Sequence, residues 1–192
     1  PGQRGTGGVM TGTQQNLTLE DAEAILREVP GVLQVAPVVQ GRGQVKYFEN
    51  NTSTAFLGTS ITYFPIRAFT LDRGRFFTDT EADHLAHVAI IGPVTAENLM
   101  GKAEPIGATI KVNGLNFQVI GVTASKGDQG WFNPDDQVII PHTTAMKHLL
   151  GIDYLREIDI QCQPGVDLTA VQNTVTALLR QRHRTPPEAP DD

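Results

Sequence analysis

The sequence predicts an α+β protein in which a small α/β unit is divided by a long, β-rich middle segment. At one end a helix precedes a strand (Thr18–Val39), and at the other a strand precedes a helix (Arg156–His183). Short alternating or apolar runs lie between them, separated by Gly, Pro, Asn and Asp, which is typical of strands joined by turns. A divided layout of this kind calls for further strands outside both helices, and neither end of the chain offers a convincing one.

Composition limits the classes of function. The 192 residues are 40% hydrophobic and 19% charged, as in an ordinary soluble domain with a real core. The net charge of −6 argues against nucleic acid or an anionic membrane surface as partner. No apolar run approaches the roughly 20 residues of a transmembrane helix. The single cysteine, Cys162, excludes an internal disulfide, and its alternating strand context favours a buried structural thiol over a nucleophile.

The first elements follow from capping and periodicity. Residues 1–16 show no periodicity and are predicted to be flexible. Thr18 and Asp21 have the spacing of a capping box, which predicts a helix start. An apolar stripe at helical spacing supports this helix: Ala22, Ile25, Leu26 and Val29. The run Val32–Val39 then predicts a strand, in which Pro37 indicates an edge or a bulge.

The remaining elements are shorter. Strands are predicted at Gln44–Phe48, Thr54–Gly58, His87–Ile91, Gln137–Ile140 and Arg156–Gln163. Helices are predicted at Pro93–Met100, at Thr143–Leu150 and from Asp167 to the basic segment Arg180–Arg184, whose charge complements the helix dipole. The proline-rich residues 185–192 are predicted to be a disordered tail.

The pair Asn113-Gly114 predicts a tight hairpin, since both residues of a two-residue type I′ turn need positive φ. That turn sets a register in which Val112 faces Leu115 and Ile110 faces Phe117. The intervening positions are all polar. One face of the hairpin is therefore expected to be buried and the other exposed.

Few residues have the spacing of a catalytic or metal site. The chain has no Walker A motif and no Gly-x-Ser-x-Gly elbow. The acidic segment Asp79–His87 begins like a calcium loop, but His84 at its sixth position and Ile90 at its twelfth exclude an EF-hand. Glu81, His84 and His87 could share a helical turn, yet a zinc site needs further ligands. A solvated acidic loop is the preferred interpretation.

The aromatic pair Trp131-Phe132 lies in a Gly- and Asp-rich segment, Ser125–Asp136. Tryptophan is enriched among the anchors of protein interfaces, so the pair is a candidate contact for a partner protein. The alternative is that one ring folds back on the sheet. Asp135 and Asp136 point to opposite faces if extended, which makes them turn residues rather than an acid/base pair.

Segments along nearly the whole chain resemble a known family in order and spacing. They are Val29–Val32 with Ala36-Pro37, Thr62–Phe64, Leu71–Phe77, His87–Gly92, Ile106-Gly107, Phe117–Val122, Val138–Pro141 and Leu178–His183. Together they make the chain similar to the periplasmic core domain of ABC transporter permeases of the MacB/FtsX-like superfamily. Met100 stands where the family usually has Phe, a departure that concerns packing only.

The resemblance implies a two-part domain between the first and second transmembrane helices of a permease. One part, similar to the porter subdomains of tripartite efflux pumps and built as a split βαβ unit, would comprise residues 17–55 and 152–184. The other, an inserted mixed β-rich subdomain, would comprise residues 56–151. The flexible residues 1–16 and the disordered tail 185–192 would lie outside both.

The resemblance also implies a non-enzymatic role without cofactors. The domain would lie on the periplasmic face of the inner membrane, bind an adaptor or substrate protein and relay conformational change in efflux or in lipoprotein or peptide export. A second copy of the permease and, indirectly, a cytoplasmic ATPase would be partners, and only flanking helices absent here would meet the membrane. The alternative function is a small metal-dependent hydrolase or metal-binding domain that uses Asp79–His87.

Overall fold

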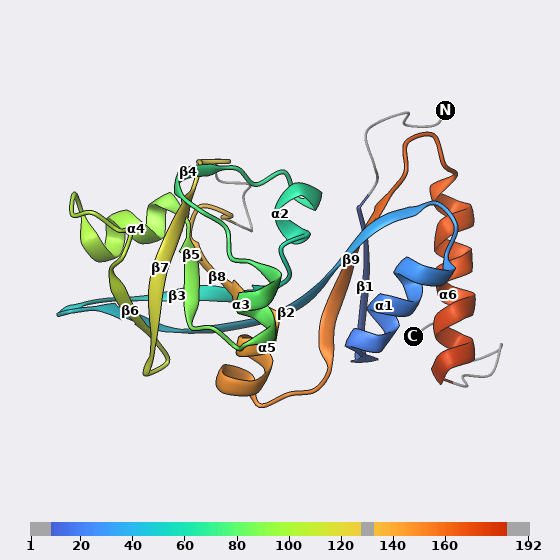
Figure 1. Cartoon of the computed structure of the whole chain (residues 1–192), viewed down its shortest axis with the longest axis horizontal. Coiled ribbons are helices and arrows are strands. Elements are labelled where there is room, and N and C mark those ends of the chain that lie inside the picture. The colour runs from blue at the N-terminus through green and yellow to red at the C-terminus, as the bar shows by residue number, and fades with distance from the viewer. Residues whose placement is uncertain (1–8, 128–132, 184–192) are drawn as a thin grey trace. The chain divides into compact units, whose positions relative to one another are not determined.

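The computed structural model describes the backbone of residues 9–127 and 133–183, and side chains from residue 17 onward. The chain divides into two compact units (Figure 1). Unit 1 comprises the residues up to Val38 and those from Asp153 on, and unit 2 comprises Val39–Ile152. Residues 39–55, which the sequence placed with the first unit, belong to unit 2, because β2 there pairs with β6 and β3 pairs with β8.

Unit 1 is built on a sheet with β9 at its centre. Strand β9 is antiparallel to β1 on one side and to the first part of β2 on the other. The elements of unit 1 are β1 (Val9–Leu17), α1 (Leu19–Glu28), the start of β2 (Val32–Tyr47), β9 (Leu155–Cys162) and α6 (Leu168–His183). The buried apolar residues of this unit include Leu17, Ala24, Ile25, Val35, Leu155, Ile158, Ile160, Val171, Val175 and Leu179.

Strand β1 corrects the expectation of flexibility for residues 9–16 and of no strand before the first helix, whereas residues 1–8 lie outside the described residues. Residues 9–17 pair with β9 from Val9 opposite Gln161 to Leu17 opposite Leu155, with a register shift after Thr13. The segment lacks apolar alternation, so the order comes from backbone hydrogen bonds to the edge of β9. The helix start was predicted correctly, since Thr18 and Asp21 form both bonds of the capping box.

The strands of unit 2 close into a ring. Neighbours in the ring are β2, β3, β8, β5 and β7, and β6 pairs with both β7 and β2. Strand β4 adds to β7 beyond the end of β6. The pairs β3–β8 and β5–β7 are parallel. The bounds of these strands are β3 (Asn50–Thr59), β4 (Leu71–Gly74), β5 (Val88–Ile91), β6 (Thr109–Val112), β7 (Leu115–Thr123) and β8 (Gln137–Pro141).

Short helices connect the strands of unit 2. They are α2 (Tyr63–Ile66), α3 (Asp79–Asp83), α4 (Pro93–Met100), α5 (His142–Thr144) and the π-helix η1 (Ala145–Leu150), which ends at Gly151 in the left-handed conformation. The largest fully buried side chains of unit 2 are Phe56, Phe64, Phe77, Phe117, Ile90, Ile91, Leu99, Ile110, Ile139 and Ile140. This aromatic and branched aliphatic core fixes the positions of the surface residues described below.

The predicted hairpin is confirmed in register and in burial. Val112 pairs with Leu115 and Ile110 with Phe117, and both turn residues have positive φ. Ile110, Val112 and Phe117 are buried, whereas the polar residues between them are exposed. Asn113 also joins the turn to β2, because its side-chain oxygen accepts from the N–H of Gln44 at 3.1 Å.

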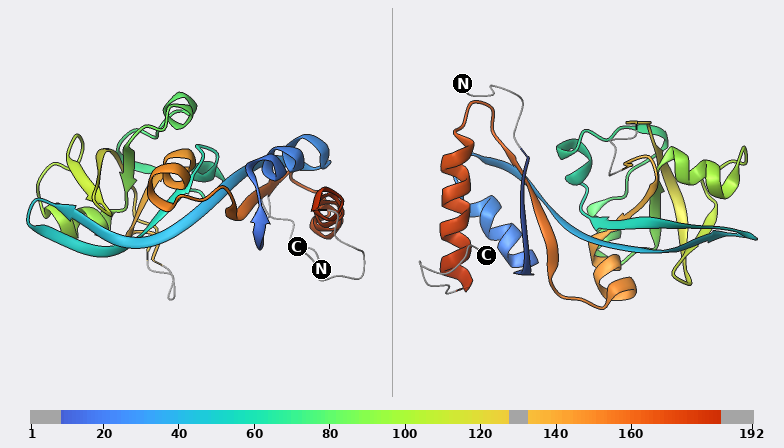
Figure 2. Two further views of the ribbon diagram at one scale, coloured as in Figure 1. Left: turned by 90° about the horizontal axis from the view of Figure 1, so that it is seen from below. Right: turned by 180° about the vertical axis from the view of Figure 1, so that it is seen from behind.

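Strand β2 is continuous, where the sequence predicted two strands with a break at the glycines (Figure 2). Gly41 and Gly43 are strand residues at which another side chain approaches the backbone. A Cβ at Gly41 would lie 2.4 Å from the ring of Phe56, and one at Gly43 would lie 2.0 Å from the side chain of Asn113. Glycine is therefore needed at these two positions because of close packing, not because the chain turns there.

Candidate functional site

The segment predicted to carry the contact residues is anchored at its base by Asp135. This carboxylate is buried and accepts hydrogen bonds from the Ser125 hydroxyl at 2.7 Å and from the N–H groups of Lys126 and Gly127 at 2.8 and 3.0 Å. Burial by itself would raise the pKa of Asp135, but these donors together lower it below its ordinary value. Asp135 therefore stays ionised and joins the two ends of the segment.

The neighbouring Asp136 is also fixed by hydrogen bonds, in this case from two threonine side chains. Its carboxylate accepts from the hydroxyls of Thr54 at 3.0 Å and Thr95 at 2.9 Å. The backbone of Asp135 lies so close to Gly92 that a Cβ there would be 2.1 Å from the Asp135 carbonyl oxygen. The two aspartates thus point in different directions and serve the structure of the loop, as the sequence indicated.

Trp131 and Phe132 themselves lie outside the described residues. Their role as a partner contact stays a prediction. At the start of the segment, the ammonium of Lys126 lies 4.4 Å from the centre of the Phe69 ring and donates to the Arg67 carbonyl. Burial, with the nearby Arg67 charge, lowers the pKa of Lys126.

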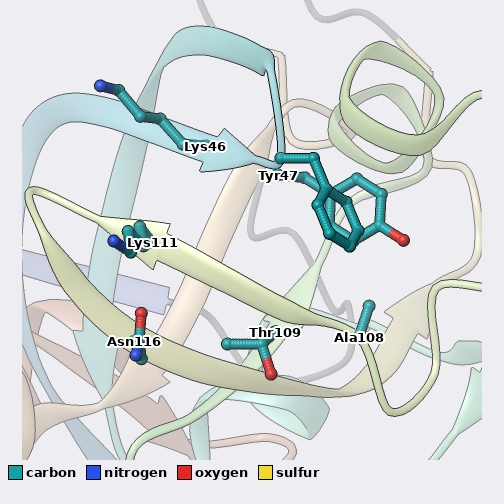
Figure 3. A pocket seen from close by; sticks show the side chains of 7 residues that line it. Lys46, Tyr47, Ala108, Thr109, Lys111 and Asn116 are labelled. Carbon is teal, nitrogen blue, oxygen red and sulfur yellow. The ribbon is translucent and has the colours of Figure 1, made fainter.

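A second candidate surface, which sequence reasoning did not single out, is a groove of about 470 Å³ at the end of β2 and beside β6. Figure 3 shows its lining: the two lysines Lys46 and Lys111, the aromatic end of β2, and the uncharged residues Ala108, Thr109 and Asn116. Phe48 completes the lining and is 86% exposed, with a φ of 51°. Its ring packs edge-on against Tyr47 with 4.6 Å between centroids. We call these seven residues the Phe48 groove.

The segment Asp79–His87 does not form the metal site considered from sequence. Glu81 is engaged by Arg75 at 2.7 Å and by the N–H of Thr78, as part of the capping box of α3. The Arg75 guanidinium holds the pKa of Glu81 below its usual range against the opposing effect of burial. Within residues 9–127 and 133–183, no group of three or more His, Cys, Asp or Glu side chains could hold a metal ion.

Two of the histidines bond to each other instead. His87 stacks on Phe117 with 4.8 Å between ring centres, and its Nδ1 lies 3.0 Å from the carbonyl oxygen of Asn116. Its Nε2 is 2.8 Å from Nδ1 of His148. Because a carbonyl oxygen only accepts, Nδ1 of His87 carries a proton, and when the His87 ring is neutral its Nε2 accepts from Nδ1 of His148. His87 therefore has a packing role on the sheet.

The single cysteine has the structural role that the sequence favoured. Cys162 is 1% exposed in β9, and burial raises the pKa of its thiol. A buried thiol with a raised pKa is a poor nucleophile, because the reactive species is the thiolate.

Unit 1 contains a charged cluster that the sequence did not reveal. Asp21 is 2% exposed and accepts from Arg182 Nε at 2.7 Å and from His183 Nε2 at 2.8 Å, while also capping α1. Burial by itself would raise the pKa of Asp21, but the bonds from Arg182, His183 and Thr18 lower it overall. This cluster joins the start of α1 to the end of α6 and has the character of a structural clamp.

Comparison with known proteins decides the family. The family described as the MacB-like periplasmic core domain matches residues 1–178. The macrolide export ATP-binding/permease protein MacB of Bdellovibrio bacteriovorus is 37% identical over 188 residues, which cover 97% of this chain and 29% of that protein. The chain belongs to the MacB-like periplasmic core domain family. The MacB protein of Chlorobaculum tepidum is 38% identical over 174 residues, covering 90% of this chain and 27% of that protein.

Solved structures show the same fold for this MacB-like domain. The periplasmic region of MacB from Actinobacillus actinomycetemcomitans matches with a TM-score of 0.83 at 23% identity, over 94% of this chain and 87% of that one. The extracellular domain of the noncanonic ABC-type transporter YknZ from Gram-positive bacteria matches with a TM-score of 0.77 at 21% identity, over 95% and 96%. Among the described residues, no helix is both long and apolar enough to span a membrane.

Proposed function

We propose that this MacB-like domain is the extracytoplasmic, non-enzymatic part of an ABC export permease, where it binds a partner or substrate protein and relays conformational change. The observation that carries the proposal is the family match over residues 1–178, together with relatives named as ATP-binding/permease proteins. The chain spans 29% of the Bdellovibrio relative, so ATP binding in such a system would belong to other parts of the protein.

The division of the chain suggests how a relay would work. Both chain termini belong to unit 1, and unit 2 is a single insertion between Val38 and Asp153. We place the porter-like role in unit 1, which the rest of a permease would hold, and partner contact in unit 2, which carries the Phe48 groove and the anchored Ser125–Asp136 segment. A force on unit 2 would reach unit 1 through the covalent connections at these two points.

The class of exported substrate is inferred from the names of the relatives. The named relatives are macrolide exporters, and we extend to this chain the broader class of efflux or lipoprotein and peptide export. Within that class the partners would be a periplasmic adaptor or substrate protein, a second permease copy and a cytoplasmic ATPase. The metal-dependent alternative has no support, since Glu81 and His87 are engaged in capping and packing.

Cysteine labelling of the full-length protein tests the location. Glu49 is exposed, whereas the native Cys162 is buried and should stay silent. In spheroplasts, a membrane-impermeant maleimide is expected to label Glu49→Cys as fully as it does after lysis, and above the level of labelling in the parent protein. Labelling only after lysis would place the domain in the cytoplasm and overturn the proposal, as would ATP hydrolysis by the purified chain.

A further inference from the structure

The outward face of β2, β6 and the start of β7 differs in charge from the rest of the chain. Side chains alternate in and out along these strands, and the outward positions carry the cations Arg42, Lys46 and Lys111. The other outward residues there are uncharged Gln, Thr and Asn. A chain of net charge −6 thus presents a face with three cations and no carboxylate on these strand segments.

Two of these cations lie directly opposite each other. Lys46 of β2 and Lys111 of β6 are antiparallel partners, which places like charges on neighbouring strands. Such a pair destabilises a sheet, whereas opposite charges at the same positions would stabilise it. Neither ammonium has a carboxylate within ion-pair distance among the described side chains. The Lys46–Lys111 pair is therefore repulsive, and a bound anion would relieve that repulsion.

Apolar surface adjoins the two lysines. The Phe48 groove continues from Lys46 to Tyr47 and the exposed Phe48, as Figure 3 shows for the aromatic end of β2. Phe48 holds a left-handed φ that non-glycine residues rarely adopt, and its exposed ring gains little from burial in the chain itself. Aromatic side chains are enriched at the centre of protein contacts, and charges around them pair with complementary charges of the partner.

We infer that the Phe48 groove binds an extended acidic segment of a partner protein, whose carboxylates pair with Lys46 and Lys111 while an apolar side chain packs on Phe48. The inference rests on the proposed function, because a partner-binding role for unit 2 is part of it. An anionic membrane is a poorer occupant, since lipid recognition typically uses about four to eight clustered Lys or Arg residues. The net charge of −6 also opposes approach to such a surface.

Peptide binding to the purified chain tests the inference. The probes are three fluorescein-labelled octapeptides in which leucine alternates with glutamate, glutamine or lysine, and the measurement is fluorescence polarisation. We expect the glutamate peptide to bind about tenfold more tightly than the glutamine peptide, with an affinity that falls as salt rises. The double variant K46E/K111E should lose that preference and favour the lysine peptide. Phe48→Ser should weaken binding of the glutamate peptide severalfold.

A charge-matched control separates the groove from net charge. The variant K102E/K147E changes two exposed lysines elsewhere in unit 2 and should bind the glutamate peptide like the parent chain. Equal binding of the glutamate and glutamine peptides, or an equal loss in K102E/K147E, would overturn the inference. Co-sedimentation of the chain with phosphatidylglycerol vesicles would also overturn the inference if K46E/K111E abolished it, because the groove would then bind a membrane. If any of these results is found while Glu49→Cys is labelled in spheroplasts, the groove inference fails but the proposed extracytoplasmic role is retained.

Discussion

At the scale of single residues, the contact role of Trp131 is the first prediction to test. The buried Asp135 holds its segment through bonds to Ser125, Lys126 and Gly127, and these bonds do not involve the Trp131 side chain. Trp131→Ala is expected to move the midpoint of thermal unfolding by less than about 2 °C. The same change should weaken binding of the proposed adaptor protein by about tenfold, because a few aromatic side chains carry most of the binding energy of a protein interface.

Calorimetry and pull-down with the purified adaptor measure the two effects of Trp131→Ala. Trp131→Phe, which keeps an aromatic ring, is the matched control and should retain most of the binding. A fall of more than about 5 °C in the unfolding midpoint of Trp131→Ala would assign the ring to the core instead.

The Asp21 cluster predicts a pH-dependent contribution to stability. The bonds from Arg182 and His183 hold the folded-state pKa of Asp21 below its ordinary value of 3.8. The contribution is therefore complete above that pH and is lost as the pH falls through the folded-state pKa. At about pH 7, Asp21→Asn should lower the free energy of unfolding by about 2 kcal/mol.

Urea unfolding of the parent chain and of Asp21→Asn measures this contribution at about pH 7 and at about pH 3. The difference in free energy of unfolding between the two proteins should be smaller at about pH 3. Glu20→Gln changes an exposed carboxylate of the same helix turn and should have little effect. A difference between parent and Asp21→Asn that is the same at both pH values would rule out the ionised carboxylate as its source.

At the scale of elements, local signals in the sequence were enough where the chain pairs with itself nearby. The Asn113-Gly114 turn fixed the register of β6 and β7, and Thr18 with Asp21 fixed the start of α1. Strand β1 could not be predicted in this way, because its pairing comes from the distant β9 rather than from its own apolar pattern. The continuity of β2 was missed because Gly41 and Gly43 suggest a loop when their neighbours in space are unknown.

The close approach at Gly41 leads to a prediction about β2. Its Cβ position lies 2.4 Å from the fully buried ring of Phe56 on β3, so any larger side chain must displace the ring. Gly41→Val is expected to lower the free energy of unfolding by about 1–3 kcal/mol, measured by urea denaturation. Gln44→Val, an exposed position of the same strand, is the control and should change little. An unchanged stability in Gly41→Val would mean that Phe56 has another place to pack.

At the scale of the whole molecule, the family was predictable because its segments keep their order over nearly the entire sequence. The candidate contacts were only partly predictable. Trp131 is conspicuous as the single tryptophan, whereas Lys46 and Lys111 are ordinary surface residues until β2 and β6 bring them opposite each other. The metal site at Asp79–His87 was only the alternative to a solvated acidic loop, and it has no support, because Arg75 and the cap of α3 engage Glu81.

The exposed apolar surface of the chain limits how it can assemble. Among the described side chains, the exposed large apolar ones are Leu26, Leu33, Phe48, Tyr154 and Leu168, and they are spread over helices, strands and connections of both units. A stable dimer interface buries roughly 800 Å² on each partner and needs a contiguous apolar centre. The purified chain is therefore expected to sediment as a monomer up to about 100 µM, whereas the full-length permease in detergent should sediment as a dimer. A chain that dimerises with a dissociation constant below about 10 µM would show that this domain supplies a permease interface by itself.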